Sequence, residues 1–145
     1  MTAPLKLMAE DADDLAIFSA HLQDAVLKVG DLAFLPKQRR FALVANRYRW
    51  EGAGSSRAKT GERVRCGLHF DGVLKVQASK IRQDAKDAVL SLLALGFEPG
   101  EDGAGTVTLT FSGGGAIRLD VEAIDAQLAD LTQAWPAKAV PEHKP

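Results

Sequence analysis

Apolar residues near the N-terminus recur at the spacing of one helix face. Four of them are separated by three or four positions: Leu15, Phe18, Leu22 and Val26. This spacing predicts an amphipathic helix. Acidic side chains run from Asp11 to Asp14, where a carboxylate can cap free backbone amides and suits the positive end of a helix. We expect the helix to begin here and to end at Gly30 or a few residues earlier.

Beyond Gly30 the pattern changes from helical spacing to the alternation typical of β-strands. β-branched and aromatic residues predict three strands in this part of the chain: Leu32–Leu35, Arg40–Trp50 and Arg63–Phe70. Pro36 ends the first strand, and Lys37–Arg39 is expected to form a turn. In the third strand alternate residues are apolar and are expected to face the core: Val64, Cys66, Leu68 and Phe70. The glycine-rich and serine-rich segment 51–62 is expected to be a loop.

Two glycine-containing turns organise the second half of the chain. Asp71-Gly72 lies between alternating runs and predicts a hairpin, with a return strand that carries Leu74, Val76 and Ala78. Gly113–Gly115 predicts a second hairpin, because residues 107–111 and 117–121 alternate between apolar and polar on either side of it.

Two further segments need a choice between helix and strand. Ala88–Phe97 is apolar on both faces, so its periodicity does not separate a strand from a buried helix. We interpret it as a strand because it runs into Glu98-Pro99-Gly100 and a series of strands follows. For Ile124–Leu131, with Asp125 in its first turn, we predict a short second helix.

These elements predict one α+β domain: a mainly antiparallel, curved sheet of about seven strands with an N-terminal and a C-terminal helix. The connections are too short for helical crossovers, which favours antiparallel pairing. A helix that closes a run of strands also suggests, by analogy, a pleckstrin-homology-like half-open barrel. We assign residues 1–134 to the domain and expect the proline-containing tail 135–145 to be disordered.

The bulk composition sets the class of protein. The chain has 145 residues and 46% hydrophobic residues, as a single globular domain would. Its single cysteine, Cys66, excludes an internal disulfide. No secretory signal is evident at the N-terminus, and no apolar run approaches the roughly 20 residues that span a bilayer. We therefore expect a cytoplasmic protein, with no membrane partner and no cofactor.

Charge changes this picture, because half of the basic residues lie between Lys37 and Arg65. This segment carries nine basic and two acidic residues, a net charge of +7, while each flank carries −4. A concentrated basic patch favours anionic partners. The residues predicted to bind an anion are Arg39, Arg40, Arg47, Arg49, Arg57, Lys59, Arg63 and Arg65.

Aromatic residues interleave with these arginines, as they do in proteins that bind single-stranded nucleic acid. Strand alternation, however, places Arg47 and Arg49 on the face opposite Tyr48 and Trp50. This separation favours an ordinary solvated face over a stacking surface for bases. One test separates the readings: arginines that share a solvent face form a binding surface, and arginines paired with acids of the flanks are structural.

The other candidate chemistries are incomplete. The loop 54–61 lacks the glycine that a phosphate-binding Walker loop needs before its lysine, which leaves only a looser anion contact through Arg57 and Lys59. Cys66 and His69 have no second pair of ligands for zinc. A serine from segment 55–56 with His69 and Asp71 would make a triad, but nothing in the pattern orders it. We assign no catalytic residue and no metal ligand.

Several segments together resemble an uncharacterised bacterial family, domain of unknown function 2948. They are residues 22–26, 29–33, 39–44, 67–74 and 106–121. The resemblance runs from about Leu5 to Leu131, nearly the whole chain. It implies a small stand-alone protein and carries over no activity and no site residue.

The sequence favours a non-enzymatic binding or interaction module with a basic surface. Its expected partner is an acidic protein surface or another anionic ligand, including nucleic acid. One alternative is a small enzyme with a pocket between the sheet and the N-terminal helix, using His69 or His21. Another is a homo-oligomer that associates through a sheet edge, either Leu32–Leu35 or Ala88–Phe97.

Overall fold

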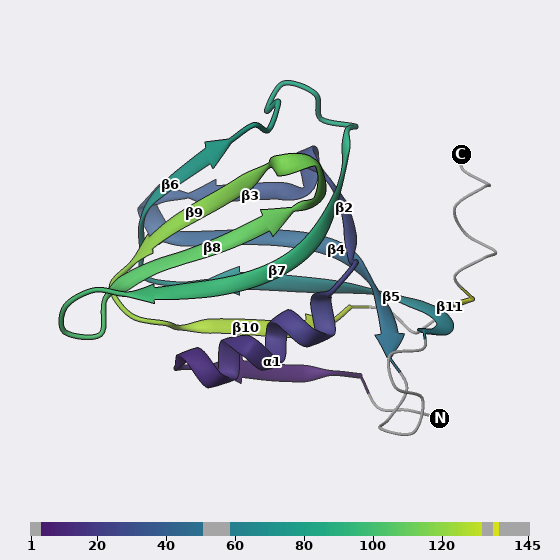
Figure 1. Ribbon diagram of the computed structural model, residues 1–145, viewed down its shortest axis with the longest axis horizontal. Helices are drawn as coiled ribbons and strands as arrows, with labels where there is room; N and C mark the ends of the chain where they lie inside the picture. The colour runs from purple at the N-terminus through teal and green to yellow at the C-terminus, as the bar shows by residue number, and fades with distance from the viewer. Residues whose placement is uncertain (1–3, 51–58, 132–134, 137–145) are drawn as a thin grey trace.

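A computed structural model of the chain describes residues 4–50, 59–131 and 135–136, and it confirms an α+β fold dominated by one antiparallel sheet (Figure 1). The first part of the chain forms β1 (Lys6–Ala9), α1 (Ala12–Leu22), β2 (Val26–Lys28), β3 (Leu32–Leu35), β4 (Arg40–Trp50) and β5 (Lys59–Phe70). The second part forms β6 (Val73–Ser79), β7 (Val89–Pro99), β8 (Gly105–Phe111), β9 (Ala116–Val121), β10 (Ala126–Asp130) and β11 (Trp135–Pro136). Short 3-10 turns are η1 (Val29–Asp31), η2 (Pro36–Gln38) and η4 (Ser112–Gly114).

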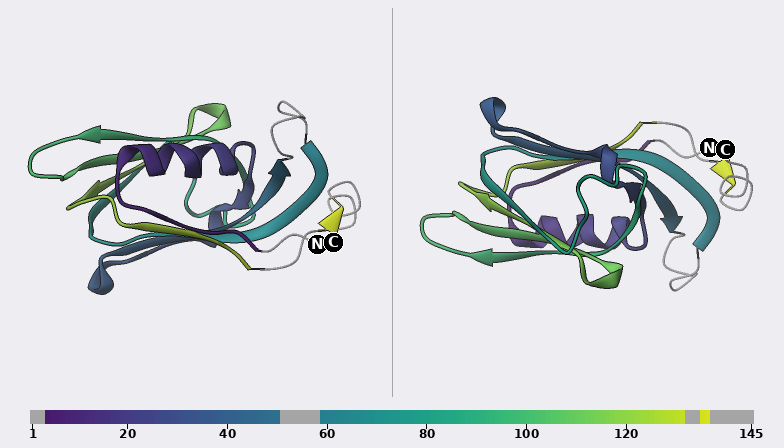
Figure 2. Two further views of the ribbon diagram at one scale, coloured as in Figure 1. Left: turned by 90° about the horizontal axis from the view of Figure 1, so that it is seen from below. Right: turned by 90° about the horizontal axis from the view of Figure 1, so that it is seen from above.

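Hydrogen-bonded strands follow the path β1-β10-β5-β4-β2-β7-β8-β9-β6, with β3 also paired to β4 and β11 to β5. Every pair among the described strands is antiparallel. The path bends into two facing layers, joined by β2, which pairs with both β4 and β7 (Figure 2). The sheet is not closed, because β1 and β6 end the path without pairing with each other.

The helix α1 fills one side between the two layers. The carboxylate of Asp11 accepts a hydrogen bond from the amide of Asp14 at 2.8 Å, which confirms the predicted helix start. The inward face is buried as the spacing predicts, through Leu15, Phe18 and Leu22. The helix ends at Leu22, so Val26 belongs to β2 and not to the helical stripe.

The core lies between the layers and follows the predicted alternation. The inward residues of β5 are all buried: Val64, Cys66, Leu68 and Phe70. The β8–β9 hairpin around Gly113–Gly115 is confirmed, with Val107 paired to Leu119 and Leu109 to Ile117. From Val89 onward the ambiguous segment Ala88–Phe97 lies in β7, so its interpretation as a strand is also confirmed.

The hairpin predicted at Asp71-Gly72 is wrong. Both edges of β5 are already occupied by β4 and β10, so β6 crosses to the other layer and pairs with β9. Backbone bonds fix this corner: the amide of Asp71 donates to the carbonyl of Asp125 at 2.8 Å, and that of Val73 donates to Arg39 at 2.9 Å. Gly72 has a φ of 71°, in the left-handed region that glycine adopts easily. Tight corners and hairpin turns both use this conformation, so the Asp-Gly pair does not distinguish them.

The C-terminal helix predicted at Ile124–Leu131 is also wrong. Residues 126–130 form β10, which pairs with β1 on one side and β5 on the other. Burial alternates along β10, with Ala126 and Leu128 inward, and the two-sided pairing satisfies backbone groups that a helix would satisfy internally. The analogy with pleckstrin-homology-like barrels rested on this helix; among the described residues α1 precedes most of the strands and no helix follows them.

The expected count of seven strands was too low, because β1, β2, β10 and β11 were missed. Of the expected tail, residues 135–136 pair with β5 as β11, and residues 137–145 lie outside the described part.

Candidate functional site

Most of the described part of the basic segment lies in β4 and β5. The pairing of these strands runs from Phe41 opposite Phe70 to Trp50 opposite Lys59. The charge of the segment is therefore concentrated in space as well as in sequence. The arginines nevertheless do not share one solvent face. They divide between the inner face, the outer face and the corner that leads into β6.

Arg47 lies on the inner face of β4, where it forms a buried ion pair with Asp130 of β10. Both guanidinium–carboxylate bonds measure 2.9 Å, and each side chain is only 6% exposed. The same carboxylate accepts the amide hydrogen of Leu5 at 2.8 Å. This pair therefore ties β4, β10 and the segment that leads into β1 together, and it leaves no free charge for a ligand.

Two more arginines pair with acids that follow β5 in the sequence. Arg40 donates to both oxygens of Asp71, at 2.7 and 3.3 Å, and so braces the corner between β5 and β6. Hydrogen bonding to Asp71 raises the pKa of Arg40. Arg39 meets Glu122 at 3.2 Å on the surface. Arg39, Arg40 and Arg47 thus pair with acids that lie outside the basic segment. Such pairing is the result that we expected of arginines with a structural role.

Two further arginines, Arg49 and Arg63, have partners on the β4–β5 ribbon itself. Arg49 pairs with Glu62 at 2.7 Å. The guanidinium of Arg63 lies 3.9 Å from the centre of the Tyr48 ring and donates to the Tyr48 hydroxyl. We expected arginine and ring to lie on opposite faces of β4, and this holds for Arg47 and Tyr48. The side chain of Trp50 lies outside the described residues, and the register shifts between Tyr48 and Trp50. Arg63 nevertheless reaches Tyr48 from the neighbouring strand, because the two residues are register partners.

Part of the predicted site cannot be placed. Arg57 and the side chain of Lys59 lie outside the described residues, as does most of the loop proposed to contact an anion. Arg65 is half-buried on β5, opposite Asn46, and its carbonyl accepts the amide hydrogen of Leu131 at 2.7 Å.

The Arg47–Asp130 pair is close enough to His21 and Cys66 for its charges to act on both groups. Burial lowers the pKa of His21, and the charge of Arg47 lowers it further while Asp130 opposes the change. Burial raises the pKa of the Cys66 thiol to about 12, so this cysteine is a neutral core residue, as its inward position predicts. At neutral pH the thiol of Cys66 is therefore protonated and the imidazole of His21 is uncharged.

His69 lies elsewhere, on the outer face of β5. Its Nε2 is 3.6 Å from Oδ2 of Asp71, an oxygen that already accepts a hydrogen bond from Arg40 at 3.3 Å. The serines of segment 55–56 are not described, so the triad is not assembled among the described residues. Within the described ranges, no cluster of three His, Cys, Asp or Glu side chains could hold a metal ion. In that same part of the chain, the helix is too short and too polar to cross a membrane.

A second basic region emerges from the fold, and the sequence reasoning missed it. Five exposed cationic side chains gather along β6, in the turn η2 and in the connection from β6 to β7; we call this set the basic edge: Lys37, Lys75, Lys80, Arg82 and Lys86. The amide of Val73 bonds to Arg39, which brings η2 beside the start of β6, and Lys80 at the far end lies beside Gly114 of the β8–β9 turn.

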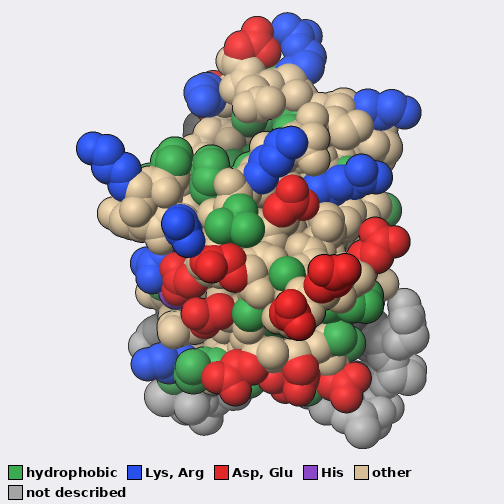
Figure 3. Space-filling model, turned by 90° about the vertical axis from the view of Figure 1, so that its left-hand side faces the viewer, with side chains coloured by type: hydrophobic (Ala, Val, Ile, Leu, Met, Phe, Trp, Pro, Cys, Tyr) green, Lys and Arg blue, Asp and Glu red, His purple; other side chains and the backbone are tan. Residues whose placement is uncertain are grey.

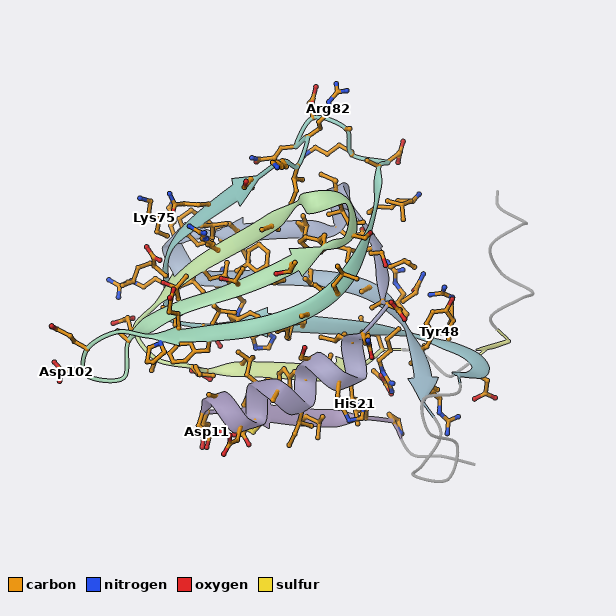
Figure 4. The ribbon with its side chains drawn as sticks, in the orientation of Figure 1. Asp11, His21, Tyr48, Lys75, Arg82 and Asp102 are labelled. Carbon is orange, nitrogen blue, oxygen red and sulfur yellow. The ribbon has the colours of Figure 1, made fainter. Side chains whose placement is uncertain are left out.

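Figure 3 shows that basic and acidic side chains are separated on one side of the molecule. Lysine and arginine side chains gather over its upper part, and aspartate and glutamate gather over its lower part. Figure 4 places Lys75 and Tyr48 at opposite ends of the molecule, so the basic edge is distinct from the Arg63–Tyr48 contact. The signal available in the sequence was Lys75 within β6 and Lys80 directly after it, because a lysine within a strand is typical of an edge.

Comparison with known proteins gives a family and no activity. No curated protein and no solved structure matches the chain. A family model described as "Protein of unknown function (DUF2948)" matches residues 5–143. This protein therefore belongs to the DUF2948 family.

Proposed function

We propose that this protein is a non-enzymatic binding module, and that the basic edge is its contact surface for an anionic partner. One observation carries the proposal: the lysines of the basic edge are exposed, and none of them forms an ion pair with a described residue. Arg82 pairs with Asp84 at 3.7 Å, but both side chains are about four fifths exposed. Such a solvated surface pair is weak and leaves Arg82 accessible to a ligand.

The contrast with the arginine segment supports this assignment. An anionic ligand at Arg47 would have to displace a buried carboxylate, and a buried charge that loses its partner is strongly destabilising. At the basic edge the charges are already in water, so a ligand replaces only counterions and loosely held water. A group of exposed cations also attracts anions over about a Debye length, roughly 10 Å at 0.1 M salt.

The test is the salt dependence of binding to a simple polyanion. Fluorescence anisotropy of labelled polyglutamate should report binding at low salt, and the logarithm of the affinity should fall linearly with the logarithm of the salt concentration. Absence of binding at low salt would contradict the proposal. Affinity that does not change with salt would contradict it as well, because the contact would then not be electrostatic.

The second candidate is a small enzyme that works between the sheet and α1, and the position of His21 is the observation in its favour. This imidazole is close enough to Arg47 and Asp130 for their charges to alter its pKa. Both oxygens of Asp130 are occupied by Arg47, and one also accepts from Leu5, so the carboxylate has little capacity left for a substrate. The binding module is the better supported of the two.

A further inference from the structure

We propose that β6 is a docking edge for an extended acidic polypeptide, which adds to the sheet as one more strand. This inference rests on the proposed function and names the partner of the same surface. The partner would bind the backbone of β6 as well as the positive charges of the basic edge. A partner strand would supply donors and acceptors in alternation, and its acidic side chains would meet the lysines of the basic edge.

The backbone of β6 has the geometry that strand addition needs. β6 ends the strand path, so its outer side faces no paired strand among the described residues. From Lys75 to Ser79 the register with β9 is regular, and the irregularity is confined to the step between Val73 and Lys75. Five residues in regular register offer an edge of roughly 16 Å at about 3.3 Å per residue.

Other edges of the sheet offer less. β7 is covered by α1 along part of its length, since the amide of Leu95 donates to the Ser19 hydroxyl at 3.0 Å and the amide of Asp24 donates to the carbonyl of Leu92 at 2.9 Å. β1 and β3 each have four residues. The predicted self-association edge at Ala88–Phe97 is therefore partly occupied, and β6 is the longer open edge.

The side chains of β6 select the class of partner. Lys75 begins the regular stretch and Lys80 directly follows it; both are exposed, and Leu74, next to Lys75, is 54% exposed. Two copies of β6 paired antiparallel would bring their lysines together, and like charges oppose such pairing. An acidic strand would instead neutralise both lysines and could cover Leu74.

Nucleic acid fits this edge less well. The phosphate backbone carries hydrogen-bond acceptors and no donors, so it could use the lysines and the outward amides of β6 but would leave the outward carbonyls unpaired. An extended polypeptide satisfies both kinds of backbone group, because each residue presents one donor and one acceptor. The open edge therefore favours a polypeptide over a nucleic acid.

The experiment compares two peptides of equal charge and equal side-chain sequence that differ only in backbone N-methylation. One is a capped eight-residue peptide that alternates Glu and Thr, and the other carries N-methyl groups on alternate residues along one edge, which removes those donors. Each is titrated into the full chain, with affinity from anisotropy and amide exchange of β6 from NMR. We expect the unmodified peptide to bind several-fold more tightly and to slow the exchange of amides between Lys75 and Ser79.

Three outcomes would overturn the inference, and they differ in what they say of the proposed function. Equal binding of both peptides without protection of β6 would sink strand addition but leave anion binding in place. Binding of single-stranded DNA with no binding of either peptide would assign the edge to nucleic acid. Failure of polyglutamate, DNA and both peptides to bind at low salt would reject the proposed function itself.

Discussion

Two regions of this molecule concentrate positive charge, and they use it in opposite ways. The β4–β5 ribbon carries arginines that meet acids or rings inside the fold, such as Arg47 with Asp130 and Arg63 with Tyr48. The basic edge carries mainly lysines that remain in water, such as Lys75 and Lys80. Segment charge alone therefore does not locate a binding surface; the position of a strand in the sheet decides what its charges do.

The chemistry of the two cations matches the two roles. Arginine is planar, forms bidentate bonds and is weakly hydrated, so it suits buried pairs between strands. Lysine is a compact, strongly hydrated charge on a flexible stem, so it suits an edge that must stay soluble until a partner arrives. β4 is paired on both sides, whereas β6 has one neighbour.

The largest effect is expected at the Arg47–Asp130 pair. Asp130→Asn should lower the free energy of unfolding by about 3 to 5 kcal/mol, because it leaves a buried guanidinium without its counter-charge. Urea unfolding followed by circular dichroism measures the change. Adding Arg47→Met should recover a large part of the loss, while the Asn side-chain oxygen still accepts from Leu5. A single variant as stable as the parent would show that the pair does not hold the strands together.

A smaller loss is expected at the Arg63–Tyr48 contact. Arg63→Gln removes a cation over a ring and two hydrogen bonds at a nearly buried position, for an expected loss of about 1 to 3 kcal/mol. Tyr48→Phe is the matched control, since it keeps the ring and should lose about 1 kcal/mol. Equal losses in the two variants would show that the hydroxyl, and not the cation over the ring, carries the contact.

The next effect depends on pH and comes from His21. Its pKa in the folded state lies below the ordinary value of 6.5, mainly because of burial and the facing charge of Arg47. The unfolded chain therefore takes up this proton first, and stability should fall as the pH drops from 6.5 through the folded pKa. His21→Gln should flatten this part of the stability curve. An NMR titration that places the pKa of His21 above 6.5 would reverse the sign.

Strands with a regular alternation of apolar and polar residues were predicted correctly from the sequence. The alternation in β5, β8 and β9 predicted both the strands and their inward faces, because burial on one side of a sheet leaves a local pattern. The corner at Asp71-Gly72 and the strand β10 were misread, since their identity depends on partners elsewhere. Asp125, which bonds to Asp71, is far from it in sequence.

The candidate site was less predictable for the same reason. Arg47 and Asp130 are separated by 83 positions, as are Arg39 and Glu122, so local spacing held no sign that these charges would meet. Lys75 in β6 and Lys80 just after it were visible in the sequence, but the predicted hairpin made β6 an ordinary partner of β5. Only the observed pairing with β9 shows that this strand ends the sheet.

The comparison of the two basic regions is tested most directly by two variants that each remove two positive charges. Lys75→Gln with Lys80→Gln removes two of the five cations of the basic edge, and Arg49→Gln with Arg65→Gln removes two cations of the ribbon. The measurement is the affinity for polyglutamate at about 0.1 M salt, where exposed charges act over roughly 10 Å. We expect the lysine variant to bind several-fold more weakly at unchanged stability, within about 0.5 kcal/mol, and the arginine variant to bind like the parent. Loss of binding in the arginine variant alone would contradict the account.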